Sequence, residues 1–184
     1  SGDARVEVPP TIQALLAARL DQLPREERLV LERGAVEGKE FHRGAVVALA
    51  PEEGDTDARL TTLVRKDLIR PDRPMLAGED AYRFRHLLIR DAAYDALPKS
   101  TRAELHERFA GWLEHRGADL VERDEILGYH LEQAYRYRAE LGQHDTELGE
   151  RSAAHLADAG RRAFARDDIG AATNLLERAS SVLS

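Results

Sequence analysis

The sequence predicts a mainly α-helical protein that carries one small β-hairpin. Apolar residues recur every three or four positions through most of the 184 residues, which is the period of amphipathic helices. Aromatic residues make up only 5% of the chain, so we expect closely packed helices with a core of Leu, Ala, Val and Ile. One stretch, Tyr82-Arg83-Phe84-Arg85, instead alternates strictly between apolar and basic residues, as a strand does.

Four helices are predicted before the hairpin. Residues 1–8 are expected to form a linker, because Pro9-Pro10 follows it and proline favours the first turn of a helix. Asp55 or Thr56 can cap the fourth helix through its side-chain oxygen. The expected helices span residues 12–23, 25–36, 43–50 and 56–67.

The hairpin is predicted over residues 68–85. Leu68-Ile69-Arg70 and the alternating stretch flank a segment rich in Pro, Gly and Asp, which are turn residues. A helix over 87–97 follows and is ended by Pro98. The last three of the four helices, followed by the hairpin, form the outline of a winged helix. We therefore predict a winged-helix-like domain over residues 9–97.

The rest of the chain, residues 98–184, is predicted to be an antiparallel helical array. Ser100 or Thr101 is expected to cap its first helix. Small residues recur where the last two helices would touch, in a pattern that matches the tetratricopeptide repeat, although Asp167 stands where glycine is common. The array would begin a longer superhelix and leave an apolar face exposed on its last helix. The expected helices span 100–116, 122–139, 146–166 and 168–183, and the small residues are Gly160, Ala163, Ala172 and Ala179.

The sequence contains no catalytic motif, and we expect a protein that is not an enzyme. It has no phosphate-binding loop, no nucleophile elbow and no His-Glu-x-x-His, so no cofactor and no metal ion is predicted. The seven histidines are expected to be surface or half-buried structural residues. The absence of cysteine, of a signal peptide and of an apolar run of about 18 residues suggests a cytoplasmic protein without membrane contact.

DNA binding is the alternative function. The helix over 56–67 is the one that a DNA-binding winged helix would place in the major groove, and its polar face offers Arg59, Arg65 and Lys66. The net charge of −7 weighs against this alternative, because phosphate contacts by Lys and Arg supply most non-specific affinity for DNA.

Three segments resemble the STAND class of bacterial signal-transduction ATPases, which includes LuxR-type ATP-dependent regulators and ATPases fused to nucleotide cyclases. The resemblance covers about the first 115 residues. Its segments are Val8-Pro9-Pro10-Thr11-Ile12-Gln13-x-Leu15-Leu16-x-x-Arg19-Leu20-Asp21-x-Leu23, then Glu37-Gly38-x-Glu40-Phe41, and then Phe84-Arg85-His86-x-x-Ile89-Arg90-Asp91-x-Ala93-Tyr94.

The resemblance implies an ATPase domain, then a winged helix, then repeats that sense a ligand or a protein partner. In that arrangement the winged helix docks on the ATPase domain, which is missing here, and relays its nucleotide state. The residues expected at that contact are Tyr82, Phe84, His86 and Arg90. We therefore expect a non-catalytic regulatory and scaffold fragment with a protein partner at its helical repeats.

Overall fold

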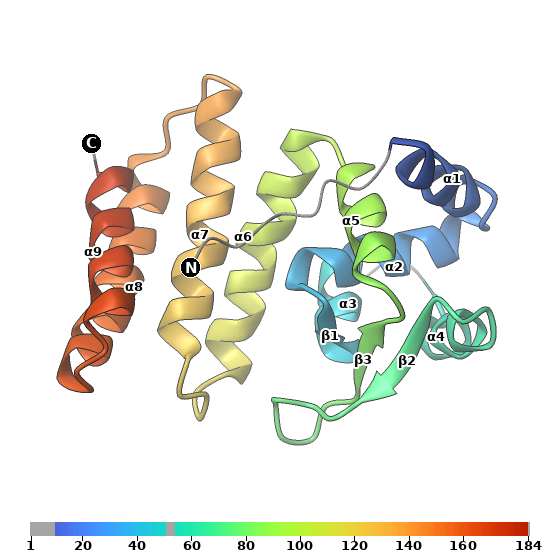
Figure 1. The fold of residues 1–184 in the computed structure, drawn as a ribbon, viewed down its shortest axis with the longest axis horizontal. Helices are drawn as coiled ribbons and strands as arrows, with labels where there is room; N and C mark the ends of the chain where they lie inside the picture. Colours follow the sequence, from blue (N-terminus) through green and yellow to red (C-terminus); the bar gives the residue numbers. More distant parts are fainter. Residues whose placement is uncertain (1–9, 51–53, 184) are drawn as a thin grey trace.

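The computed structural model describes residues 10–50 and 54–183, and this part of the chain is mainly helical with one small antiparallel sheet (Figure 1). The predicted linker over residues 1–8, Pro9 and the loop residues 51–53 lie outside the described residues. The elements before the array are α1 (Pro10–Asp21), α2 (Arg25–Glu37), β1 (Glu40–His42), α3 (Arg43–Leu49), α4 (Thr56–Arg65), β2 (Ile69–Asp72), β3 (Ala81–Phe84) and α5 (Leu87–Asp95).

The predicted hairpin is confirmed as β2 and β3, but the sheet has a third strand that the sequence analysis missed. The strand order is β1-β3-β2, and Phe41 of β1 lies opposite Tyr82 of β3. Ile69 of β2 lies opposite Phe84 on the other side of β3. A strand of three residues is too short to display an alternating pattern, so β1 forms because β3 offers it a paired edge.

Residues of the first half form their elements for reasons visible in the sequence. The carboxylate of Asp55 accepts a hydrogen bond from the backbone N–H of Ala58, which confirms the predicted cap of α4. Gly34 lets α2 approach the sheet, because a Cβ atom there would lie 2.8 Å from the ring of Phe41. Phe41 is fully buried and anchors the sheet on α2.

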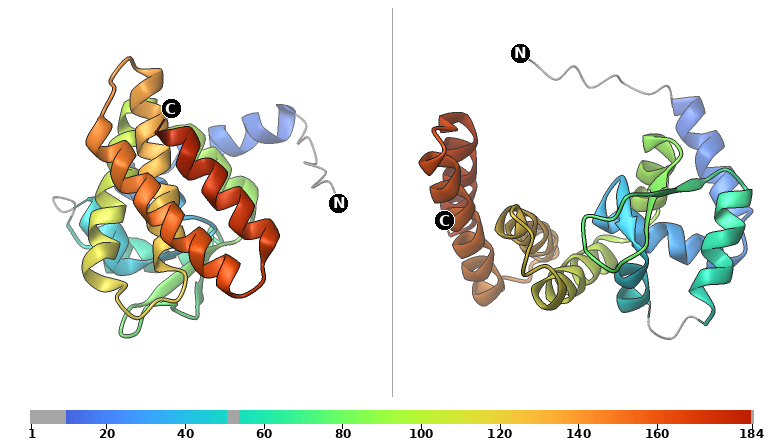
Figure 2. Two further views of the ribbon diagram at one scale, coloured as in Figure 1. Left: turned by 90° about the vertical axis from the view of Figure 1, so that its left-hand side faces the viewer. Right: turned by 90° about the horizontal axis from the view of Figure 1, so that it is seen from below.

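The second half is the helical array of α6 (Lys99–Arg116), α7 (Arg123–Glu140), α8 (Thr146–Ala165) and α9 (Ile169–Val182), in which each helix packs on the next (Figure 2). The predicted cap of α6 is wrong: this helix begins at Lys99, directly after Pro98, without a side-chain cap. Close approach of α8 and α9 at Gly160 is confirmed, because a Cβ atom there would lie 2.9 Å from Cγ of Leu176.

The turn between α8 and α9 depends on two aspartates. Asp167 adopts a left-handed conformation with φ of 60°, which is the backbone region that glycine usually supplies. The carboxylate of Asp168 then caps α9 by accepting a hydrogen bond from the N–H of Ala171.

The main hydrophobic core runs without a break from the sheet into the array. It includes Phe41 and Ile69 in the sheet, Phe109 in α6 and Leu131 in α7, and it ends at Leu148 in α8. A smaller cluster between α8 and α9 contains, among others, Leu156, Ala163, Ala172 and Leu175. The array is therefore built onto the sheet-bearing half through α6 and α7.

Candidate functional site

The four residues that were predicted to contact a neighbouring domain lie in β3, in the corner that follows it and in α5. Phe84 is buried, with its ring 5.2 Å from that of Phe41, so it positions the sheet rather than offering a surface. Tyr82 is half-buried, and its ring stacks with that of Phe41 at 5.9 Å. His86 is exposed at the start of α5, where its side chain makes no capping hydrogen bond.

The fourth of these residues, Arg90, fastens α5 to α2. Its Nε donates a hydrogen bond of 3.0 Å to the carbonyl oxygen of Ala35. Its guanidinium also lies 4.7 Å from the ring centroid of Tyr94, a cation–π distance, and pairs with Asp91. Arg90 is thus half-buried and holds α5 against α2, which leaves His86 as the exposed member of the set.

Tyr94, at the end of the same motif, joins the sheet-bearing half to the array. Its hydroxyl oxygen lies 2.7 Å from Nε2 of His106 in α6 and 3.1 Å from the hydroxyl of Tyr137 in α7. The guanidinium of Arg102 in α6 lies 4.6 Å from the ring centroid of Tyr94. One buried side chain of α5 therefore contacts both of the first two array helices.

His106 continues this buried polar cluster to His130 in α7, with 2.8 Å between their Nδ1 atoms. His106 is 0% exposed and His130 is 2% exposed. Burial, with a contribution from Arg90 and Arg102, lowers the pKa of His106 to about 3. Burial and the neighbouring His106 likewise lower the pKa of His130 well below its usual value. Both rings are neutral near pH 7, so one Nδ1 donates a hydrogen to the other.

This buried histidine pair differs from the prediction that the histidines are surface or half-buried residues. A signal was present: His106 lies three residues before Phe109 and His130 lies three after Leu127, so each occupies a helical stripe of core residues. The buried Glu132 was not predicted either. Its carboxylate binds the guanidinium groups of Arg136 at 2.7 Å and Arg178 of α9 at 2.6 Å.

The predicted DNA-contact residues do not form a uniformly basic face on α4. Nζ of Lys66 lies 2.6 Å from a carboxylate oxygen of Glu27. Arg65 is exposed and Arg59 is half-buried. Asp57, in the first turn of α4, forms an ion pair with Arg43 and adds negative charge to this face.

Two arginines of the hairpin, Arg83 and Arg85, are paired with acids. Arg83 of β3 binds Glu40 of β1 and lies 2.7 Å from Asp72 of β2. Arg85 pairs with Asp67 at 3.2 Å. The surface over α4 and the hairpin is therefore of mixed charge.

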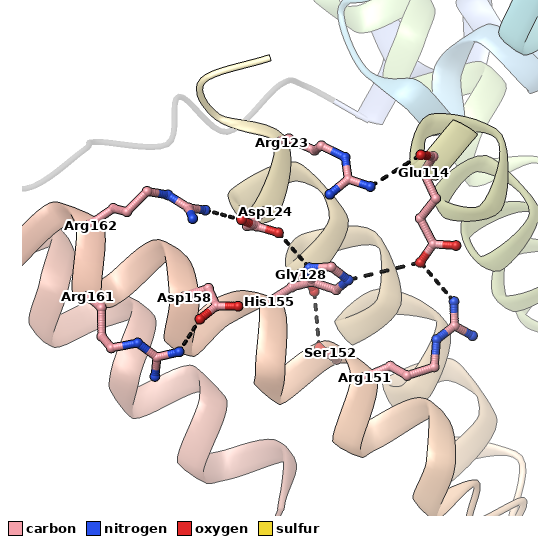
Figure 3. A network of polar contacts seen from close by, with 10 residues as sticks. All are labelled: Glu114, Arg123, Asp124, Gly128, Arg151, Ser152, His155, Asp158, Arg161 and Arg162. Carbon is pink, nitrogen blue, oxygen red and sulfur yellow. Dashed lines mark hydrogen bonds and ion pairs between the residues drawn. The ribbon is translucent and has the colours of Figure 1, made fainter. Parts of the chain in front are cut away.

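A network of polar contacts connects α6, α7 and α8 on one side of the array (Figure 3). Asp124 of α7 accepts a hydrogen bond of 2.7 Å from Nδ1 of His155 and pairs with Arg162. Burial alone would raise the pKa of Asp124, but the hydrogen bonds from His155 and Arg162 outweigh burial and lower that pKa. Glu114 of α6 binds Arg151 of α8 at 3.1 Å, so α8 contacts both preceding helices.

In residues 10–50 and 54–183, no group of three or more His, Asp or Glu side chains lies close enough to hold a metal ion. None of the described helices is long and apolar enough to cross a membrane. No protein-family profile matches the chain, and no curated protein or solved structure is significantly similar to it.

Proposed function

We propose that this chain is a non-catalytic regulatory module that links a neighbouring domain to a protein partner. The sheet-bearing part, residues 9–97, would dock on an ATPase domain of the same chain, and the array, residues 98–184, would begin a partner-binding superhelix. The observation that carries this proposal is the placement of Tyr94, whose hydroxyl contacts both α6 and α7 from α5. A displacement of α5 by a docked domain would therefore move Tyr94 and change its contacts with α6 and α7.

The order of elements supports the resemblance to a winged helix and a repeat array. The succession α2, β1, α3, α4, β2, β3 is a three-helix unit with a three-stranded antiparallel sheet, in which the hairpin β2–β3 follows the third helix. The array adds antiparallel helices with a small-residue contact at Gly160, as tetratricopeptide repeats do. A STAND-type ATPase is the neighbour that the resemblance implies.

Exposed apolar side chains at both ends of the described chain supply surfaces for two neighbours. In α1, Leu15 is 71% exposed and Ile12 is 42% exposed. In and after α9, Leu183 is 62% exposed, Ile169 is 55% exposed and Leu176 is 43% exposed. Apolar side chains that gather on the first and last helices fit a module placed between two partners.

Binding of duplex DNA tests this proposal against the alternative. Fluorescence anisotropy with mixed-sequence DNA at a low and a moderate salt concentration is expected to show no binding, because the basic residues of α4 and the hairpin are balanced by acids. Salt-sensitive binding that is lost in the Arg59→Ala, Arg65→Ala, Lys66→Ala triple variant would overturn the proposal in favour of a DNA-contact module. The matched control removes the exposed Arg161 and Arg166 of the array.

A further inference from the structure

A cavity of about 440 Å³ lies where the sheet-bearing half meets the array. Apolar side chains from three parts of the chain form most of its wall: Leu76 before β3, Phe109 and Leu113 of α6, and then Leu120 in the turn before α7 with Ile126 of α7. Its volume is in the range of pockets that hold small organic ligands.

One buried polar side chain in this wall has a free hydrogen-bonding position. His130 lines the cavity and is only 2% exposed. Its Nδ1 is occupied by His106, whereas its Nε2 has no hydrogen-bond partner among the described residues. This nitrogen is not among the fully buried polar atoms without a partner in the described residues, so it is accessible from the cavity that His130 lines. A ligand in the cavity would supply the missing partner.

The contacts behind His130 allow Nε2 to act as an acceptor. When Nδ1 of His130 donates to His106, Nε2 of His106 carries a hydrogen and donates it to the hydroxyl oxygen of Tyr94. Tyr94 then donates to the hydroxyl of Tyr137, which is only half-buried and can turn its own hydrogen to water. In that arrangement Nε2 of His130 presents a lone pair to the cavity.

The charges around the cavity favour a cation. Glu122 and Glu125 line it, and neither carboxylate has an ion-pair partner among the described residues. The arginine in the wall, Arg178, forms an ion pair with the buried Glu132, which it shares with Arg136. Glu37, also in the wall, is already bound by the Nδ1 atom of His42 at 2.6 Å. The uncompensated charge is therefore negative, which disfavours anions.

We propose that this cavity binds a small organic cation, an ammonium group on an apolar body such as an arylalkylamine. The apolar body occupies the wall formed by Phe109, Leu113 and Ile126. The ammonium group donates to Nε2 of His130, and the exposed carboxylates of Glu122 and Glu125, which also line the cavity, attract the cation through their charge. This binding goes beyond the proposed function and requires neither the neighbouring domain nor a protein partner, so the two can fail independently.

The only tryptophan of the chain, Trp112, reports on the cavity. Its ring lies 5.7 Å from that of Phe109 and 6.3 Å from that of His42, and both residues line the wall. Tryptophan fluorescence, supported by calorimetry, can follow titrations with three probes of similar shape: phenethylamine, the neutral phenethyl alcohol, and the anion hydrocinnamate.

We expect saturable binding of phenethylamine, weaker binding of the alcohol and none of hydrocinnamate. The Glu122→Gln, Glu125→Gln double variant should weaken phenethylamine about tenfold and leave the alcohol unchanged. The control, Glu150→Gln with Glu177→Gln, removes two exposed carboxylates of the array away from the cavity and should change neither. Absence of phenethylamine binding, equal binding of all three probes, or an amine affinity that the double variant does not change would each overturn the proposal.

Discussion

The hydroxyl oxygen of Tyr94 lies 2.7 Å from Nε2 of His106, and this contact joins α5 of the sheet-bearing half to α6 of the array. Both residues are buried, so the hydrogen bond is shielded from water. Together with the contact to Tyr137 in α7, it makes the junction a polar connection set inside a hydrophobic core.

The Tyr94→Phe variant should lower the free energy of unfolding by about 1 to 3 kcal/mol. The ring and its packing remain, but Nε2 of His106 loses its partner and stays buried. Urea denaturation measures this change. Tyr135→Phe is the matched control, because Tyr135 is half-buried in the same core and its hydroxyl has no hydrogen bond within the described residues. Equal losses in the two variants would argue against a stabilising bond at Tyr94.

Stability should fall in mild acid because of the buried histidines. The pKa of His106 is about 3 in the folded protein and near the ordinary 6.5 in the unfolded chain. Between these values the unfolded state binds the extra proton, so this contribution is complete above about pH 6.5 and is lost progressively as the pH falls toward 3. Lowering the pH from 7.5 to 5 should reduce the free energy of unfolding by about 2 kcal/mol through His106 alone. The depressed pKa of His130 acts in the same direction.

Urea denaturation at the two pH values tests the histidine contribution against that of the carboxylates. His106→Gln removes one of the two titrating rings, so its stability should depend less on pH than that of the wild type. His144→Gln is the control, because His144 is exposed and should leave the pH dependence unchanged. A His106→Gln variant with the pH dependence of the wild type would contradict this account.

Gly128→Ala should destabilise the protein by about 1 to 3 kcal/mol, because α7 and α8 touch at this position. The added Cβ atom would lie 2.8 Å from the side chain of Leu156 and 3.0 Å from its backbone nitrogen. Gly111→Ala gives the opposite expectation: nothing lies within 4 Å of that Cβ position in α6, so better helix propensity should stabilise by up to about 1 kcal/mol. Thermal denaturation of the two variants should therefore show melting temperatures that move in opposite directions.

Glu132→Ala should destabilise the array by about 1 to 3 kcal/mol, since it leaves Arg178 without its partner. Arg136 is half exposed and can turn to solvent, which limits the loss. Chemical denaturation checks the value, and Glu150→Ala supplies an exposed carboxylate for comparison. A loss no larger than that of Glu150→Ala would show that the buried ion pairs contribute little.

The local features of the fold were predictable because their causes lie within a few residues. The cap at Asp55 and the close approach at Gly160 follow from one residue type in one position. The apolar face predicted to be exposed on the last helix follows from helical periodicity, and Ile169 and Leu183 are exposed there.

The features that depend on distant partners were not predictable from the sequence. His106 and His130 are 24 residues apart, and although helical periodicity indicates that each is buried, it does not indicate that the two rings bind each other. β1 exists only through its pairing with β3, 41 positions later in the register of Phe41 and Tyr82. The burial of Phe84 in β3 likewise depends on the side chain of Phe41, which belongs to β1.

Amide hydrogen exchange of the Tyr94→Phe variant tests most directly whether the two halves are coupled. We expect faster exchange than in the wild type both in α5 and in α7, with α9 unchanged, because Tyr94 reaches Tyr137 of α7 directly. The Tyr135→Phe control should leave both helices as they are. An increase confined to α5, with α7 exchanging as in the wild type, would contradict a relay through this junction.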